Sequence, residues 1–195
     1  MAEVVVGIDF GSSGSGFAYA FNDNKDEIIH GMIHGANVDN KVPTEIILDD
    51  NNKTVKFGVE CIEYLEKKGL KAGHYFKEIK MNLYEKKTSI VAKNSEKILP
   101  LALIIQRVLE KLKYLAIAEI KKNRPISQNN IKYVVTIPAI WEEFQKSIMM
   151  EACINAGLIT EDADKSLFFA LEPEAASCYC SKNKNIDQNY LKQGN

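Results

Sequence analysis

The stretch that decides the fold lies near the N-terminus and reads Val4-Val5-Val6-Gly7-Ile8-Asp9-Phe10-Gly11-Ser12-Ser13-Gly14-Ser15-Gly16. Its β-branched residues predict a strand over Glu3–Asp9, and the Gly and Ser residues after Phe10 predict a turn. We expect Phe17–Phe21 to return as a second strand and Glu27–His34 to form a third. These hairpin strands would form an antiparallel flank of a sheet.

Farther along the chain, predicted helices and strands alternate. Apolar residues recur at steps of four and three from Leu101 to Leu115, which predicts a helix over Pro100–Lys122 with one apolar stripe. After this helix we expect a strand over Ile131–Ile137, a helix over Glu142–Ala156 and a strand over Ser166–Leu171. A final helix would begin at Pro173. Such alternation implies parallel strands joined by right-handed crossovers. With the antiparallel flank, it predicts an α/β fold of the ribonuclease-H-like class, with a mixed five-stranded sheet, flanking helices and an inserted subdomain.

The insertion divides the predicted core into two segments. Residues 1–34 and 97–182 would form the core, residues 35–96 the inserted subdomain and residues 183–195 a polar tail. Within the insertion, the turn-forming Asp49–Asn52 predicts a hairpin between Pro43–Leu48 and Thr54–Gly58. A short helix is expected over Val59–Lys68.

Composition excludes several classes of function. The chain has 195 residues, 46% of them hydrophobic and 26% charged, with a formal net charge of −1. Without a concentrated basic patch, nucleic-acid binding is disfavoured, because phosphate neutralisation needs clustered Lys and Arg. No stretch approaches the roughly 20 apolar residues of a membrane span, and the N-terminus lacks the basic region of a signal peptide. We therefore expect a cytoplasmic protein whose four cysteines are reduced and pack as small apolar groups.

Three unusual residues fall at predicted strand ends, where open α/β sheets bind their ligands. Asp9 closes the first strand, Pro138 the fourth and Glu172 the fifth. Small residues after Asp9 would let backbone N–H groups approach phosphate oxygens, and Asp9 suits a hydrated Mg²⁺. Each feature also has a plain structural explanation: a hairpin turn, a strand terminator at Pro138, or an acid favoured by a helix dipole at Glu172.

Together these residues match known motifs. Val6–Ser13 resembles the first phosphate motif of the Hsp70, actin and sugar-kinase superfamily. Tyr133–Trp141 and Leu171–Ser177 resemble two Hsp70 segments, and the wording Glu-Pro-Glu-Ala-Ala together with Trp141 is similar to the divergent Hsp70 type 12 group. The resemblance covers essentially the whole chain and identifies it as the N-terminal lobe of an Hsp70-like, actin-fold ATPase domain.

The resemblance implies roles for particular residues. Asp9 would hold the water shell of Mg²⁺, and Gly11, Ser12, Ser13 and Gly14 would line the phosphates of ATP or ADP. Glu172 would place metal waters or the attacking water. Lys80 would assist γ-phosphate transfer, although as a lysine it is equally well explained by a solvated surface. Pro138 would act as an interlobe switch with Lys146 in the place of its arginine relay.

The sequence also departs from the family pattern. Ser12 and Ser13 stand where Thr-Thr is usual, Gly14 replaces a tyrosine and should loosen the loop, and Lys146 lacks the planar fork of arginine. No second phosphate motif or second lobe is present within these residues, so we expect weak or undetectable ATP binding and no useful turnover from this chain alone. The partners implied are the nucleotide, the missing second lobe, and co-chaperones and client polypeptides of a stress-response chaperone.

Two further functions remain open. One is a non-catalytic Hsp70-like binding module that has lost its ATPase activity, favoured by the changes in the loop. The other is a ribonuclease-H-like nuclease, which ranks low because two-metal nucleases need several carboxylates and we find only Asp9 and Glu172 at strand ends. A metal site at His30 and His34 is also disfavoured, because their spacing of four suits a helix and they lie on a predicted strand.

Overall fold

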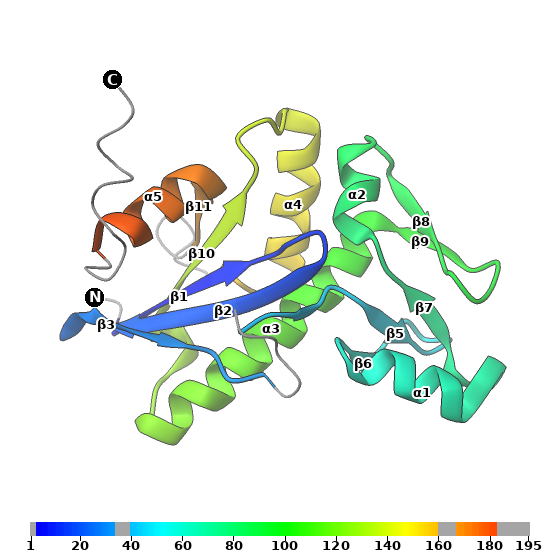
Figure 1. The fold of residues 1–195 in the computed structure, drawn as a ribbon, viewed down its shortest axis with the longest axis horizontal. Helices are drawn as coiled ribbons and strands as arrows, with labels where there is room; N and C mark the ends of the chain where they lie inside the picture. Colours follow the sequence, from blue (N-terminus) through cyan, green and yellow to red (C-terminus); the bar gives the residue numbers. More distant parts are fainter. Residues whose placement is uncertain (1–2, 34–39, 160–166, 183–195) are drawn as a thin grey trace.

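The computed structural model describes residues 3–33, 40–159 and 167–182, and its centre is a mixed sheet (Figure 1). The strand order is β11-β10-β1-β2-β3. These strands are β1 (Val4–Asp9), β2 (Gly14–Phe21), β3 (Asn24–His30), β10 (Ile131–Ile137) and β11 (Leu167–Leu171). A two-residue strand, β4 (Val42–Pro43), pairs with the start of β2.

Pairing within the sheet follows the predicted plan. β1 pairs in parallel with β10, and β10 pairs in parallel with β11. β2 is antiparallel to both β1 and β3. The carboxyl ends of the three parallel strands therefore meet at one edge, which brings Asp9, Pro138 and Glu172 to the same end of the sheet.

One face of the sheet packs against two helices, α3 (Leu101–Asn123) and α4 (Glu143–Asn155). Alternate residues of β1 and β10 are buried on this face, and the apolar stripe of α3 joins them in one core cluster. A capping box between Glu142 and Gln145 starts α4. Gly157, with φ +67°, follows its C-cap, and its N–H donates to the carbonyl of Ile154 as in a Schellman turn.

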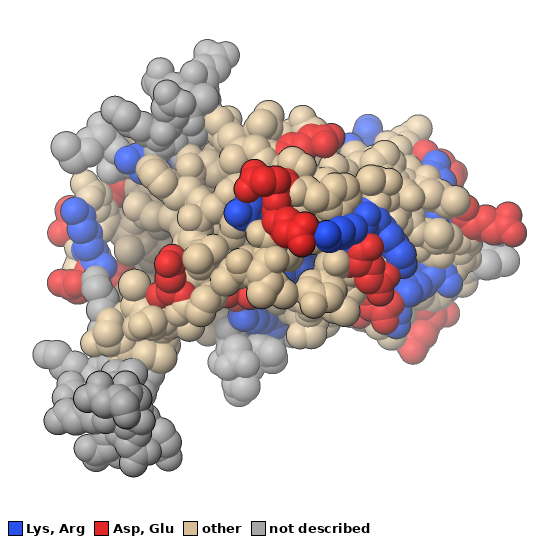
Figure 2. Space-filling model, turned by 90° about the horizontal axis from the view of Figure 1, so that it is seen from above, with Lys and Arg blue, Asp and Glu red and all other residues tan. Residues whose placement is uncertain are grey.

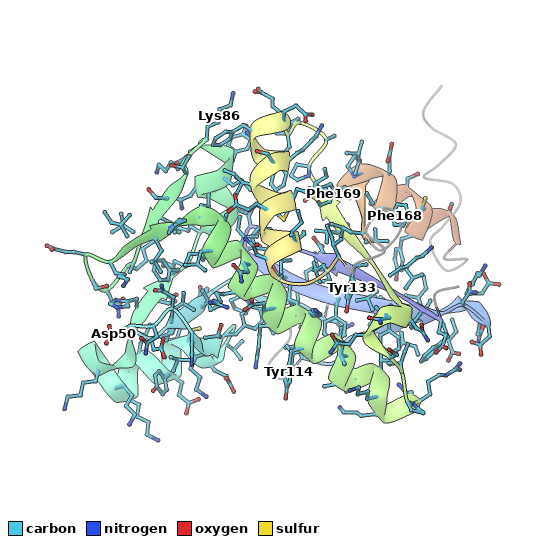
Figure 3. The ribbon with its side chains drawn as sticks, turned by 180° about the vertical axis from the view of Figure 1, so that it is seen from behind. Asp50, Lys86, Tyr114, Tyr133, Phe168 and Phe169 are labelled. Carbon is cyan, nitrogen blue, oxygen red and sulfur yellow. The ribbon has the colours of Figure 1, made fainter. Side chains whose placement is uncertain are left out.

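The opposite face carries α5 (Glu172–Lys182), which packs on β10 and β11. Figure 3 shows Phe168 and Phe169 on β11 beside this helix, and Tyr133 on β10 near α3. Tyr133 is buried, and burial raises the pKa of its phenol. The two faces of the sheet are thus covered by different helices.

Residues 44–100 form two small sheets beside the core. The first contains β5 (Ile46–Leu48), β6 (Thr54–Phe57) and β7 (His74–Phe76); the second contains β8 (Ser89–Val91) and β9 (Ile98–Pro100). The helical elements are α1 (Glu60–Lys68), the 3₁₀ turn η1 (Gly69–Ala72) and α2 (Ile79–Tyr84), and a second 3₁₀ turn, η2 (Gln128–Asn130), precedes β10. Ile46, Phe76 and Leu83 belong to the same buried cluster as β1 and α3. The segment is therefore packed onto the core, and the boundaries of the inserted subdomain stay a prediction.

Several local expectations differ from the structure. β2 begins at Gly14 rather than at Phe17, because Gly14 and Ser15 pair with β4. β3 ends at His30, and the predicted strand Pro43–Leu48 is interrupted by Thr44 and Glu45, whose neighbours pair with different strands. His34 and the predicted tail lie outside the described residues.

The four cysteines are free thiols. Cys61 and Cys153 are buried among apolar residues, as predicted, whereas Cys178 is exposed and Cys180 is half-buried, so the prediction was wrong for Cys178. Desolvation raises the pKa of the Cys61 and Cys153 thiols to about 12. Carboxylates of Glu45 and Glu60 add to the shift at Cys61. Among the described residues, no helix has the length and apolar character needed to cross a membrane. On the face shown in Figure 2, Lys and Arg side chains are interspersed with Asp and Glu.

Candidate functional site

A cleft of about 760 Å³ opens at the carboxyl ends of the parallel strands. Eight of the nine site residues predicted from sequence line it, together with residues 41–43 and Val59. The eight are Asp9, Gly11, Ser12, Ser13, Gly14, Lys80, Pro138 and Glu172. Residues from both ends of the chain thus converge on one cavity.

The loop between β1 and β2 is fixed by a closed ring of hydrogen bonds. The N–H of Gly11 donates to Ser15 Oγ at 3.2 Å, and the hydroxyl of Thr44 donates to the Gly11 carbonyl at 2.8 Å. Ser15 Oγ and Thr44 Oγ1 lie 2.7 Å apart. Since the Thr44 proton is already donated, Ser15 must donate to Thr44. Every hydroxyl in the ring therefore both donates and accepts, which fixes the backbone of Gly11.

Gly11 is required by the close approach of the loop to itself. A Cβ atom at this position would overlap the carbonyl oxygen of Gly14. Ser12 and Ser13 at the tip of the loop are exposed and line the cleft. The loop presents small, polar groups on a fixed backbone, which is the arrangement that suits a phosphate.

Asp9, the last residue of β1, stands beside the loop with both carboxylate oxygens engaged. Thr136 of β10 donates its hydroxyl to Asp9 Oδ1 at 3.0 Å, and Lys41 Nζ lies 2.6 Å from Asp9 Oδ2. The Asp9 and Lys41 side chains remain 36% and 37% exposed. The pair is thus fixed in position but open to an incoming ion.

Lys80 is buried rather than solvated. It lies in the first turn of α2, and its ammonium donates to the carbonyl of Phe10 at 2.6 Å and to Glu172 Oε1 at 2.5 Å. The ring centroids of Phe10 and Trp141 lie 5.9 and 5.5 Å from Nζ. Lys80 therefore joins α2 to the core of the molecule, and its side chain is 7% exposed against 40% for Glu172.

The predicted switch residues are separated. Pro138 follows β10 and lines the cleft. Lys146 lies on α4, where its ammonium is 3.4 Å from Glu143 Oε1, and it is absent from the described lining of the cleft. The structure thus brings Pro138, but not Lys146, to the candidate site.

Sequence reasoning missed four polar residues of the site: Ser15, Lys41, Thr44 and Thr136. Ser15 was assigned to the turn and Thr136 to the end of a strand, with no contact expected of either. Thr44 after Pro43 gave no signal, because its contact with Gly11 spans 33 residues. Lys41 was missed because nothing in the sequence distinguishes it from the other lysines.

A second hollow of about 690 Å³ lies over the sheet face next to α5. It shares Asp9, Lys41 and Glu172 with the cleft and is lined elsewhere mainly by small residues of the sheet and α5. His30 borders it, with its ring edge-on to Tyr179 at 6.4 Å. No group of three or more His, Cys, Asp or Glu side chains within the described ranges is arranged to bind a metal directly.

Several known proteins are similar to this chain over most of its length. Heat shock 70 kDa protein 12A of Mus musculus is 34% identical over 194 aligned residues, which cover 92% of this chain. The human proteins Heat shock 70 kDa protein 12A and 12B are 33% and 32% identical over the same share. Over 92% of its length the chain is therefore similar to Hsp70 proteins of the type 12 group. No protein-family model matches the chain.

This similarity agrees with the observed topology. The mixed sheet with helices on both faces is the ribonuclease-H-like fold of the actin and Hsp70 domains. The Hsp70-like chain spans 28% of the length of the relatives that it matches. The predicted fold class and the predicted family are both confirmed.

The donor set of the cleft fits a magnesium–phosphate group. Mg²⁺ retains most of its waters and takes one or two carboxylates with phosphate oxygens, and here Asp9 and Glu172 supply two carboxylates at the edge of a glycine-rich loop. Lys41 and Lys80 supply two ammonium groups on the same cleft, so its four charges balance. In this Hsp70-like chain, Asp9 would hold the metal through water, and the loop and lysines would hold phosphate.

Proposed function

We propose that this chain forms one wall of a Mg-ATP or Mg-ADP site in an Hsp70-like ATP-binding protein. The observation that carries the proposal is the convergence of the Gly11–Gly14 loop, Asp9, Lys80 and Glu172 on one cleft. A bound Mg²⁺ would neutralise phosphate charge and order the water molecules around it.

The loop would bind phosphate oxygens through the backbone N–H groups and hydroxyls of Ser12 and Ser13. Its rigidity matters, because hydrogen-bond donors fixed in advance need no reorganisation when the ligand enters. Lys80, held in place by Phe10 and Glu172, would direct a buried positive charge towards the terminal phosphate. Glu172 would orient a water molecule, since more than a third of its side chain remains accessible.

We further propose that these 195 residues bind nucleotide weakly and do not turn it over on their own. Asp9 and Glu172 are each more than a third exposed, so solvent screens the charges that phosphoryl transfer would need. Millimolar binding corresponds to about −4 kcal/mol at 25 °C. An affinity of that order is what a single wall with two ammonium groups and one loop can supply.

A non-catalytic Hsp70-like binding module is the second candidate. It is favoured by the ion pair of Asp9 with Lys41, which occupies the carboxylate that a catalytic metal would need. The two candidate functions predict different results when the other wall of the nucleotide site is supplied. An ATPase would then release inorganic phosphate from ATP, and a non-catalytic binding module would not. The roles of chaperone, stress-response protein and cytoplasmic protein also remain proposals.

Site-resolved NMR detects weak binding and therefore suits this test. Titration of ¹⁵N-labelled protein with Mg-ATP is expected to shift the amide resonances of Gly11–Gly14 and residues next to Lys80, with a dissociation constant of about 1 mM. Asp9→Asn should weaken the response about tenfold, because the carboxylate that holds the metal waters is lost. Lys122→Met, on an exposed residue of α3, is the matched control and should leave the titration unchanged.

Two outcomes would contradict the proposal. Shifts confined to residues away from the cleft would place the ligand elsewhere, and an unchanged titration in Asp9→Asn would remove the metal role of Asp9. A micromolar dissociation constant would instead contradict the weak-binding part. Release of inorganic phosphate above the buffer rate would show that this chain turns over by itself.

A further inference from the structure

Lys41 was absent from the predicted site, yet it contacts the carboxylate at the centre of the cleft. It precedes β4, and the pairing of Val42 with Ser15 and of Pro43 with Gly14 fixes its backbone beside the start of β2. Its Nζ lies 2.6 Å from Asp9 Oδ2. The residue lines both the cleft and the hollow next to α5, and it therefore stands on the border between them.

The path of the Lys41 side chain depends on two glycines. A Cβ atom at Gly14 would lie 3.3 Å from Lys41 Cβ, and a Cβ atom at Gly16 would lie 3.3 Å from Lys41 Cγ. Both distances are shorter than ordinary van der Waals contact, so any larger residue would push against the side chain. Gly14, which we expected to loosen the loop, instead begins β2 and leaves room for Lys41 to reach Asp9.

We propose that Lys41 is the counter-ion of Asp9 when no nucleotide is bound and pairs with phosphate when Mg-nucleotide enters. This inference rests on the proposed function. Before nucleotide binds, the ammonium neutralises Asp9 and opposes the entry of a divalent cation alone. When Mg-nucleotide enters, Asp9 would hold the waters of the metal, and the Lys41 ammonium would pair with a phosphate oxygen.

Charge and distance support this exchange. A hydrated dication that approaches Asp9 meets a positive charge 2.6 Å from the carboxylate oxygen, and like charges at such range repel. The Lys41 and Asp9 side chains are each about one third exposed, so solvent and an incoming ligand can reach the ammonium without crossing a packed core. Since the Lys41 stem crosses Gly14, the last residue of the phosphate loop, a short movement brings its ammonium towards the loop tip.

The exchange predicts opposite effects of one substitution on two ligands. In Lys41→Met, the apolar stem is kept and the charge is lost. Mn²⁺ alone, followed by paramagnetic broadening of the Gly11–Gly14 amide resonances, should bind about fivefold more tightly because no ammonium then competes for Asp9. Mg-ATP, followed by amide shifts, should bind about fivefold more weakly because a phosphate-binding cation is missing. A residue that only supported the loop would weaken both ligands.

Two further variants complete the experiment. Lys41→Arg retains a positive charge and should stay within about twofold of the wild type for both ligands. Lys122→Met removes a lysine outside the cleft and should change neither titration. Amide resonances outside residues 9–16 and 40–44 report whether each variant is folded, and Lys41→Gln replaces Lys41→Met should the latter fail to fold.

The results separate this inference from the proposed function. If the wild type binds Mg-ATP at the loop but Lys41→Met shifts both affinities in one direction, or neither, the role of Lys41 is wrong and the nucleotide site stands. If the wild type shows no Mg-ATP response at the loop, both fail. Tighter Mn²⁺ binding together with weaker Mg-ATP binding in Lys41→Met supports the exchange.

Discussion

Lys80 and Glu172 form the ion pair through which α2 is held to the core, and its contribution to stability can be bounded from the structure. Replacing Lys80 by Met keeps the aliphatic stem and removes the ammonium that contacts the Phe10 carbonyl and Glu172. Replacing Glu172 by Gln keeps the shape and removes the negative charge. The pair is suited to a double-mutant cycle because both substitutions are nearly isosteric.

Burial sets the expected size of each effect. Exposed ion pairs contribute about 0–1 kcal/mol, whereas breaking a fully buried pair costs about 3–5 kcal/mol. Lys80 is 7% exposed and Glu172 is 40% exposed, so this pair lies between the two cases. We expect Lys80→Met to lower the free energy of unfolding by about 2–3 kcal/mol, which includes an unpaired Phe10 carbonyl. Glu172→Gln should cost about 1–2 kcal/mol, and the coupling between them should be about 1 kcal/mol.

Urea unfolding followed by circular dichroism at 222 nm measures all four proteins of the cycle. The i,i+3 pair of the exposed Lys122 with the partly buried Glu119 on α3 provides a comparison, and its coupling should not exceed about 0.5 kcal/mol. A Lys80–Glu172 coupling indistinguishable from that of the control would refute the reasoning. So would a Lys80→Met variant as stable as the wild type, because a buried ammonium with two oxygen partners cannot then be holding α2 in place.

Three other substitutions or conditions test separate parts of the structure. Thr44→Val should lower the free energy of unfolding by about 1–3 kcal/mol, since it leaves the Gly11 carbonyl without its donor; urea midpoints no lower than that of the wild type would count against the hydrogen-bond ring. Tyr133→Phe should raise stability by about 1 kcal/mol and Tm by about 2–4 °C, because the buried hydroxyl has no partner among the described residues; calorimetry showing a lower Tm would reveal a missed partner. Above pH 9 the free energy of unfolding should fall, because Cys61 and Cys153 keep their protons in the folded state while unfolded thiols ionise. The loss should reach about 1 kcal/mol per cysteine by pH 10, and Cys153→Ala should flatten the decline in urea unfolding measured from pH 8 to 10.

The elements of the core were predictable because their sequence signals are local. The stripe on α3 and the alternation on β10 follow from side-chain periodicity, and the order of elements then limits the topology. Residues 74–100 gave no comparable signal. Their strands are three residues long, which is too short for a period to be recognised, and Glu78 adopts φ 58° before α2, which no local rule demands.

The residues of the candidate site also fall into two groups, those with a local sequence signal and those placed by contacts between distant parts of the chain. Asp9 and Glu172 were found because they end strands, and Gly11 because it lies in a run of small residues. Lys41 and Thr44 were missed because their partners lie about 30 residues away, and only the pairing of β4 with β2 brings them to the loop. Lys80 was proposed from the family pattern alone. Its burial depends on packing against Phe10 and Trp141, which no local sequence signal specifies.

The four charges of the cleft are divided between two parts of the chain. The carboxylates of Asp9 and Glu172 stand at the ends of core strands, whereas Lys41 and Lys80 both come from the predicted insertion, and each lysine pairs with one carboxylate. A ligand that brings its own phosphate and metal charges competes with both pairs at once. Because the pairs also link the predicted insertion to the core, we infer that exchanging their partners changes how tightly the two are held together. Protection of α2 amides from hydrogen exchange should therefore respond to Mg-ATP in the wild type, and should respond less when Lys80 and Lys41 are both replaced by Met. An equal response in that double variant would show that the linkage does not run through these charges.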